Sequence, residues 1–338
     1  MAEDAAPKAD AVRKFSAPRV FALLLLLGLG LVPLFAQWLG QPFWVTLFTR
    51  ILIFALAAMG LNLVLGFGAM VSFGHAMYIG IGAYAVGILS FHGVDSGWWQ
   101  LLAALGAGGL IAVAVGAICL RTSGMAFIMI TLAFAQMLYF LAVSLREYGG
   151  DDGMPLKGRS LFGGLDLNNS MVLYYLAFAL LLAVLFGFSR LVHSRFGMVL
   201  RGGRSNPRRM ASLGFPMLRY RLSAYVISAL VCVLAGMLLA NLARFVSPSY
   251  MAWTVSGELI VMTVLGGLGT LIGPIAGATA LLLVEEALSS LHLGLPWLDK
   301  LVNQHWLALI GLFIVLVVLV LKQGLYGWLV AREARRST

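Results

Sequence analysis

The chain has 338 residues, of which 61% are hydrophobic and only 11% are charged. An average soluble domain is about 45–50% apolar and about 25% charged, so a water-soluble globule of this size would lack polar residues for its surface. Disorder is excluded too, because disordered chains are polar and highly charged. The composition therefore indicates a polytopic, all-α membrane protein, and the length allows about ten spans of about 20 residues.

The net charge is +10, from 23 Lys and Arg and 13 Asp and Glu residues. The basic residues lie between apolar runs, which is typical of cytoplasmic loops in membrane proteins and does not indicate nucleic-acid binding. Cys119 and Cys232 lie inside apolar runs and are interpreted as small hydrophobic residues. No metal site and no disulfide framework are expected from this pattern.

Ten apolar segments are predicted to be helices, because a helix satisfies its own backbone hydrogen bonds in lipid. The first follows a basic segment without a convincing cleavage site, so it is interpreted as a retained span and not a signal peptide. The predicted organisation is a cytoplasmic N-terminal segment (1–19), a transmembrane domain (20–321) with a cytoplasmic loop (192–222), and a cytoplasmic tail (322–338). The ten segments cover about residues 20–39, 43–66, 70–91, 98–120, 125–145, 171–191, 223–243, 257–272, 274–292 and 305–321.

The distribution of charge predicts the orientation of these spans. With the N-terminus inside, the inner segments hold 17 of the 23 basic residues and 4 of the 13 acidic ones. Eight of these arginines lie in the single loop 190–221. The asymmetry has the sign that the positive-inside rule requires, so both termini are predicted to be cytoplasmic.

Two stretches are rich in glycine. Residues 60–90 hold seven glycines, and two interpretations are open: close packing of helices through small residues, which is favoured, and a helix broken around a cavity. In the stretch 266–277, Pro274 follows Gly273, which predicts a break near 266–274. The fold is therefore expected to contain broken or re-entrant segments.

The loop 193–221 carries the signals of a short helix. Ser205 or Asn206 is suited to an N-cap, Pro207 to the first turn, and Gly214 to a left-handed C-cap. The spacing alone leaves two interpretations equally open. One is a surface that a partner protein binds, and the other is an interfacial helix whose arginines face lipid phosphates.

Polar residues inside spans mark pathways or packing sites, because they cost free energy in lipid. Ser72 and His75 are three residues apart and would share one face of a helix. His75 suits either a proton carrier or a structural hydrogen-bond donor, and the structural role is favoured because its span has no carboxylate. Acidic residues near outer ends, Glu258, Glu285 and Glu286, are interpreted as hydrated, and Arg50 as reaching the outer interface. The candidates for pathway or packing are Asn62, Ser72, His75 and Gln136.

Motifs of enzymes are missing from the sequence. It holds no Gly-x-x-x-x-Gly-Lys-[Ser/Thr] phosphate loop, no His-Glu-x-x-His and no Gly-x-Ser-x-Gly. The chain is therefore not expected to be an enzyme, to have catalytic residues, or to bind ATP through such a loop.

Several motifs together resemble the LivM-type permeases of branched-chain amino acid ABC importers. They occur in the order of that family and cover about residues 45–330. They are Gly60-Leu-Asn-Leu-Val-Leu-Gly-Phe-Gly68, Ser72-Phe-Gly-His75, Gly80-Ile-Gly-Ala-Tyr84, Thr131-Leu-Ala-Phe-Ala-Gln136, Gly149-Gly-Asp-Asp-Gly-Met154, Ser194-Arg-Phe-Gly197, Ala211-Ser-Leu-Gly214, Val246-Ser-Pro248, Gly266-Gly-Leu-Gly-Thr270 and Gly273-Pro-Ile-Ala-Gly-Ala278.

This resemblance implies a permease domain in the bacterial inner membrane, paired with a second permease that is LivH-type or identical. Two ATP-binding subunits would dock from the cytoplasm, and a periplasmic binding protein would deliver the substrate. ATP would be bound by those subunits, so no cofactor is expected in this chain. Asp151 and Asp152 would face the binding protein. The ATPase-coupling loop would use Arg195, Arg201, Arg204, Arg208, Arg209, Leu213 and Gly214.

Two departures from the family pattern stand out. The coupling segment lacks two acidic residues usual there, since it reads Arg204-Ser-Asn-Pro-Arg-Arg209. Met70 stands where Gln is common, which makes the position less polar if it faces the pathway. The expected substrate is a branched-chain or related amino acid, with urea, amides and aromatic or other carboxylates as alternatives. A stand-alone proton- or ion-coupled transporter is the alternative function, and an ion channel is a third possibility.

Overall fold

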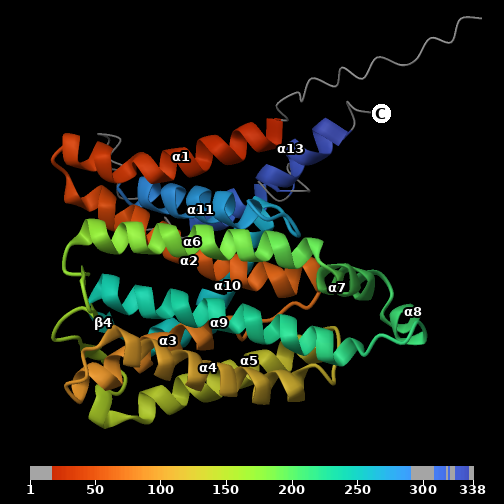
Figure 1. The fold of residues 1–338 in the computed structure, drawn as a ribbon, viewed down its shortest axis with the longest axis horizontal. Helices are drawn as coiled ribbons and strands as arrows, with labels where there is room; N and C mark the ends of the chain where they lie inside the picture. Colours follow the sequence, from red (N-terminus) through yellow and green to blue (C-terminus); the bar gives the residue numbers. More distant parts are fainter. Residues whose placement is uncertain (1–16, 291–307, 317–318, 320–323, 335–338) are drawn as a thin grey trace, which may run out of the picture.

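The computed structural model describes residues 17–290, 308–316, 319 and 324–334, and it is built almost entirely of helices (Figure 1). The long elements are α1 (Ala17–Trp38), α2 (Pro42–Asn62), α3 (His75–Phe91), α4 (Gly97–Cys119), α5 (Met125–Ser144), α6 (Ser170–His193), α7 (Arg195–Ser205), α8 (Pro207–Ser212), α9 (Met217–Ala243), α10 (Trp253–Gly266), α11 (Gly273–Ser289) and α13 (Leu325–Ala334). Short elements are the π-helix η1 (Leu63–Phe67), the 3-10 turns η2 (Arg146–Tyr148) and η3 (Pro248–Met251), and the strands β1 (Met154–Pro155), β2 (Leu161–Phe162), β3 (Leu165–Asp166) and β4 (Phe245–Val246).

Six helices in the described part are long and apolar enough to cross a membrane, namely α1, α2 with η1, α4, α5, α6 and α9. Helices α3 and α10 are apolar but shorter. The prediction of an all-α polytopic membrane protein is confirmed, and nine of the ten predicted spans coincide with a helix. The tenth, 305–321, lies partly outside the described residues, within which 308–316 are helical.

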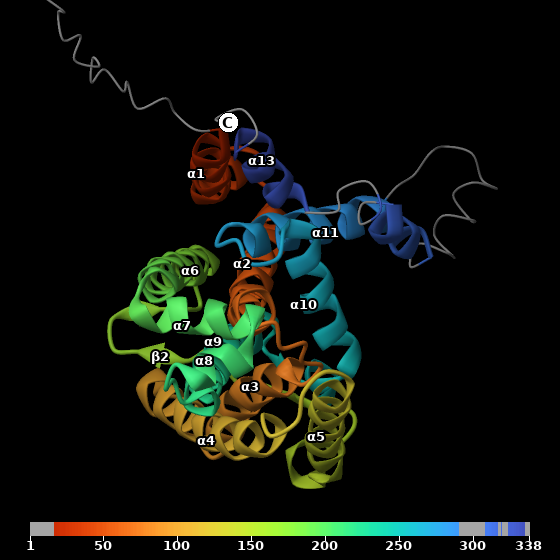
Figure 2. The ribbon, with the colours of Figure 1, turned by 90° about the vertical axis from the view of Figure 1, so that its right-hand side faces the viewer.

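Helices α2 and α9 form the centre of the bundle, with α3 and α4 on one side of α9 and α10 and α11 on one side of α2 (Figure 2). The apolar stretch of α2 is 94% buried, whereas those of α1, α4, α5 and α6 are at most 28% buried. The outer helices expose large apolar side chains such as Leu110, which suits contact with lipid.

The prediction that glycines allow close helix packing is confirmed between α3 and α9. A Cβ atom on Gly236 would lie 1.9 Å from the carbonyl oxygen of Ile79, and one on Gly82 would lie 2.1 Å from that of Val233. No side chain fits at either position, so the two backbones touch through paired glycines.

The span predicted over about 70–91 starts later than expected, because residues 68–74 are not helical and α3 begins at His75. The broken-helix interpretation, which the sequence did not favour, is correct here alongside close packing. Helix α2 widens into η1, and the chain then turns through Ala69, whose φ of 53° is rare for a residue other than glycine. We call residues 68–74 the first break.

The predicted break near 266–274 is confirmed. Helix α10 ends at Gly266, and α11 begins at Gly273 with Pro274 in its first turn. The intervening residues 267–272, called the second break, turn at Gly267 and Gly269, whose φ values are 121° and 74°. Glycine adopts such angles without steric cost, so this turn is encoded locally.

The end of the bundle opposite α8 is closed by short strands that the sequence did not predict. Strand β1 pairs antiparallel with β4, which ties the α5–α6 connection to the segment after α9. Arg159 secures the same connection, because its Nε donates to the carbonyl of Asn241 at 2.9 Å.

Candidate functional site

His75 is completely buried at the first turn of α3, between two serine hydroxyls. Its Nδ1 lies 3.0 Å from Oγ of Ser72, and its Nε2 lies 2.9 Å from Oγ of Ser228. The Ser228 hydroxyl donates to the carbonyl of Gly60 at 2.5 Å, so it accepts from Nε2, and Nδ1 accepts from Ser72. Both ring nitrogens of a neutral imidazole are thus satisfied, an arrangement that suits the structural role favoured from the sequence.

The side chains of Ser72 and His75 are in hydrogen-bond contact, but not for the predicted reason. Ser72 precedes α3, so the two residues do not share a helix face. Two amide groups near the break find side-chain acceptors on distant helices: Ala76 N donates to Oγ of Ser256 at 2.9 Å, and Phe73 N donates to Oγ1 of Thr131 at 3.3 Å. The first break is therefore stabilised by α5, α9 and α10 together.

The side chain of Asn62, at the end of α2, forms hydrogen bonds to the second break. Its Nδ2 donates to the carbonyl of Thr270 at 2.7 Å, and its Oδ1 accepts from the amide of Gly269 at 3.1 Å. Because Asn62 ends α2, the second break is fixed to the start of η1, the π-helix that leads into the first break. Of the four predicted pathway or packing residues, Asn62, Ser72 and His75 lie around the breaks. Gln136 is half-buried on α5 and takes no part in the hydrogen bonds described here.

The segment between α6 and α9 is largely helical. The predicted short helix is confirmed as α8: Oδ1 of Asn206 accepts from the amide of Arg209 at 3.0 Å, Pro207 occupies the first turn, and Gly214 follows with a φ of 88°. The sequence analysis missed α7, which buries Val199 and Leu200 against the bundle.

The arginines of this segment divide into two groups. Arg201 reaches the end of α6, where its Nη2 donates to the carbonyl of Val192 at 3.2 Å. Arg204 donates from Nη1 to the carbonyl of Gly66 in η1. The remaining predicted coupling residues, Arg195, Arg208, Arg209, Leu213 and Gly214, are exposed. Arg201 and Arg204 are exposed too, and what distinguishes them is that their side chains also bond the bundle.

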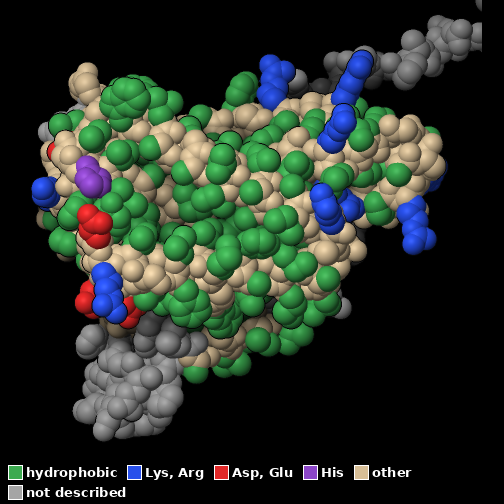
Figure 3. Space-filling view, turned by 90° about the horizontal axis from the view of Figure 1, so that it is seen from below, with side chains coloured by type: hydrophobic (Ala, Val, Ile, Leu, Met, Phe, Trp, Pro, Cys, Tyr) green, Lys and Arg blue, Asp and Glu red, His purple; other side chains and the backbone are tan. Residues whose placement is uncertain are grey.

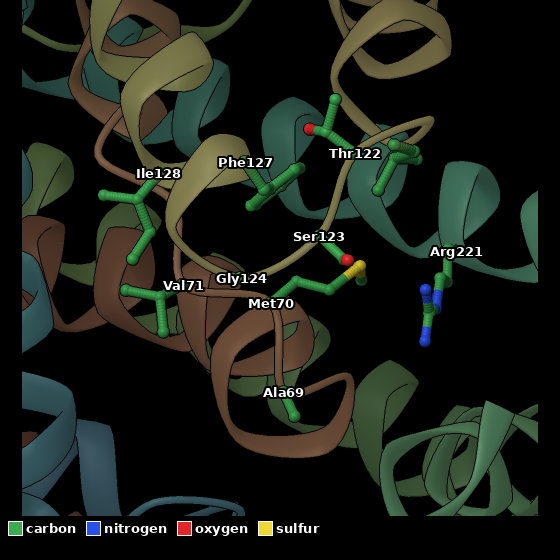
Figure 4. A pocket seen from close by; sticks show the side chains of 10 residues that line it. Ala69, Met70, Val71, Thr122, Ser123, Gly124, Phe127, Ile128 and Arg221 are labelled. Atoms are coloured by element: carbon green, nitrogen blue, oxygen red, sulfur yellow. The ribbon is translucent and has the colours of Figure 1, made fainter.

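A small pocket of about 120 Å³ opens at the α8 end of the bundle. It is bounded by the first break, the turn between α4 and α5, and the start of α9. Figure 4 shows Met70 extending toward Ser123, with Arg221 beyond them. Met70 thus lines a pocket, at the position whose low polarity the sequence analysis noted.

A larger cavity of about 610 Å³ opens at the opposite end, among α2, α9, η3, α10 and α11. Arg50, Tyr250, Glu258 and Glu286 line it together. From the sequence alone, Arg50, Glu258 and Glu286 are interpreted one by one, as residues near the outer membrane interface. No local spacing connects them, because they come from three helices that only the fold brings together.

Charged side chains gather at the two ends of the molecule, with a broad apolar band between them (Figure 3). Lys and Arg dominate the end that carries α7 and α8, and the visible Asp and Glu lie at the other. Asp151 and Asp152 are exposed in the α5–α6 connection, beside the paired strands β1 and β4.

These features define a polytopic membrane transport protein with two broken helices near its centre and a helical segment projecting from one end. The chain belongs to the family described as branched-chain amino acid transport system / permease component, whose sequence model matches residues 43–320. Family membership makes it a permease subunit and not an enzyme, and it confirms the resemblance to the permeases of ABC importers.

Curated relatives support this assignment. The chain is 26% identical to the high-affinity branched-chain amino acid transport system permease protein LivM of Escherichia coli K12, over 92% of this chain and 78% of that protein. LivM of Salmonella typhimurium matches to the same extent. LivH of Escherichia coli K12 is also 26% identical, over 81% of this chain and 91% of LivH.

Proposed function

We propose that this permease moves a branched-chain or related amino acid across the bacterial inner membrane, driven by ATP hydrolysis in two partner subunits. A periplasmic binding protein delivers the substrate, and a second permease, LivH-type or identical, completes the pathway. The names of the relatives support the substrate class. Both chain termini and the α7–α8 segment lie in the cytoplasm in this proposal, and Asp151 and Asp152 face the binding protein.

The observation that carries the proposal is the construction of the α7–α8 segment. Arg208, Arg209 and Leu213 are exposed on and after a capped helix, while Arg204 joins the preceding helix to η1. A surface lying only on lipid headgroups needs no such link to the centre of the bundle. A docking surface for an ATPase does need one, because movement of the ATPase must reach the helices that gate the pathway.

Charge reversal tests the docking surface. The double variant Arg208→Glu, Arg209→Glu is expected to lose the ATP-binding subunits on co-purification while the permease still inserts in the membrane. Arg19→Glu is a matched control, since that residue lies at the start of α1, away from α8. Unchanged recovery of the ATPase together with unchanged transport would mean that α8 is only interfacial.

Arg204 tests the transmission of movement separately. Arg204→Ala is expected to retain the ATPase but to lower ATP-driven uptake about 5- to 150-fold, the range of typical coupling energies. Uptake and ATP hydrolysis are measured together in proteoliposomes. An uptake-to-hydrolysis ratio equal to that of the unaltered protein would contradict a coupling role for the Arg204–Gly66 hydrogen bond.

A stand-alone proton-coupled transporter has less support. His75 is the buried histidine nearest the breaks, and both of its ring nitrogens already have hydroxyl partners. Proton-coupled uptake by vesicles that contain the permease alone, without ATP, would favour that alternative.

A further inference from the structure

The cavity of about 610 Å³ at the end opposite α8 combines charged and apolar walls. Arg50 enters it from α2, Glu258 from α10 and Glu286 from α11. Between them the wall is apolar, and its side chains include Phe54, Ile79, Leu239, Leu242 and Val255. The volume lies within the range of about 300–1,000 Å³ that is usual for small-molecule sites.

The charged groups of this cavity have no fixed partners among the described residues. Arg50 makes no salt bridge or side-chain hydrogen bond there, and its guanidinium lies 5.7 Å from the centre of the Phe54 ring. The side chains of Glu258 and Glu286 likewise form no salt bridge within the described part. Arg50 is nevertheless near enough to Glu258 for their charges to interact. Arg50 and Glu258 are exposed and Glu286 is half-buried, so a charged ligand that enters the cavity can reach all three side chains.

We propose that this cavity binds the zwitterionic head group of an α-amino acid with an apolar side chain. Arg50 binds the carboxylate, since a guanidinium matches its two oxygens. Glu258 and Glu286 bind the ammonium group, and the apolar wall contacts the side chain of the amino acid. This proposal rests on the proposed function and narrows it to the substrate class.

The two glutamates discriminate among the candidate substrates. A simple carboxylate would satisfy Arg50 but leave Glu258 and Glu286 without a cation, and urea would pair neither charge. Sites built to pair a polar group reject analogues that lack it, because the matching group of the site is then left without its ligand partner. An amino acid is the one candidate that complements both signs of charge in the cavity.

The head group of phosphatidylethanolamine has the same chemistry, an ammonium group beside an anion. The test therefore uses the complete importer in two kinds of vesicle. One contains phosphatidylethanolamine, and the other contains only phosphatidylcholine and phosphatidylglycerol. The solutes are leucine, 4-methylpentanoate, which lacks the ammonium group, 3-methylbutylamine, which lacks the carboxylate, and urea.

The unaltered importer is expected to take up leucine and none of the other three solutes. Arg50→Gln and Glu258→Gln are each expected to lower leucine uptake at least about tenfold, in both kinds of vesicle. Glu147→Gln is the control, because Glu147 is an exposed glutamate of η2 that does not line the cavity. It should change uptake less than about twofold. Retained ATPase binding by each variant verifies that it is folded.

The outcomes separate this inference from the proposed function. ATP-driven uptake that is unaffected by Arg50→Gln and Glu258→Gln overturns the zwitterion site and leaves the importer function intact. ATP-driven uptake of the carboxylate or of urea, without leucine, does the same. Defects that vanish without phosphatidylethanolamine identify a lipid site instead. Only the lack of ATP-driven uptake of any solute by the unaltered importer would contradict the proposed function itself.

Discussion

Both breaks interrupt apolar helical stretches of the bundle, but different hydrogen bonds hold them in place. At the first, residues 68–74, hydroxyl groups of three other helices bond the chain. Thr131 bonds Phe73 inside the break, and Ser228 and Ser256 bond the two residues that start α3. The second, residues 267–272, has more bonds of its own: Oγ1 of Thr270 donates to the carbonyl of Gly267 at 2.7 Å and accepts from the amide of Gly273 at 3.1 Å, in addition to the two bonds from Asn62.

This difference shows two ways to interrupt a helix where water is scarce. A buried backbone group needs a partner, and the partner comes either from the turn itself or from neighbouring helices. The second break combines two bonds from its own threonine with two from Asn62, whereas the first has one internal side-chain bond, between Ser72 and Gly74, and otherwise depends on hydroxyl groups of other helices. Movement of α5 or α9 should therefore alter the first break more than the second.

The largest expected effect tests the dependence of the first break on tertiary contacts. His75→Leu removes the partner of two buried hydroxyls, on Ser72 and Ser228, and should destabilise the protein by about 2–4 kcal/mol. Thermal unfolding in detergent measures the change. His92→Leu is the control, because His92 is exposed and should change stability by no more than about 0.5 kcal/mol. Equal melting temperatures for the two variants would show that the first break does not need His75.

A smaller effect is expected at Asn62, whose side chain bonds the second break. Asn62→Ala removes the hydrogen bonds to Gly269 and Thr270 and should cost about 1–3 kcal/mol. Hydrogen exchange should then accelerate at residues 267–272 more than at residues 68–74, because the hydroxyl contacts of the first break remain. Equal acceleration at both breaks would show that they open as one unit.

The smallest expected effect concerns the local closure of the second break. Thr270→Val keeps the shape of the side chain but removes its hydroxyl, at a cost of about 0.5–1.5 kcal/mol. Thr270→Ser retains the hydroxyl and should be close to the unaltered protein. Faster exchange at residues 68–74 in the valine variant would contradict the local character of this turn.

The same contrast explains what could be predicted from the sequence. Apolar runs predicted the long helices, Gly273 with Pro274 predicted the second break, and Asn206 to Gly214 predicted α8. All of these signals are local. The start of α3 at His75 was missed as a helix boundary although Gly74 precedes it, because the whole stretch 60–90 is rich in glycine and this one does not stand out.

The site was less predictable than the helices for a similar reason. Asn62 and His75 stood out as polar residues in apolar runs, but their partners Ser228 and Thr270 did not. The cavity with Arg50 and Glu258 joins helices about 200 positions apart in the sequence, and each residue alone is consistent with the membrane interface. Helix α7 was missed because its residues mix arginine, glycine and apolar side chains, and Ser194 was not recognised as its N-cap residue.

The hydrogen bonds of the first break also have a consequence for synthesis. Ser228 follows His75 by 153 residues, and Gly269 follows Asn62 by 207. A ribosome that adds about 5–20 residues per second needs roughly 8–30 s to pass from His75 to Ser228. Before that time α3 lacks the later helices whose hydrogen bonds hold its first turn in place. The N-terminal half of the chain therefore completes its fold only after α9 and α10 have been inserted, which makes these later helices the chain's own assembly partners.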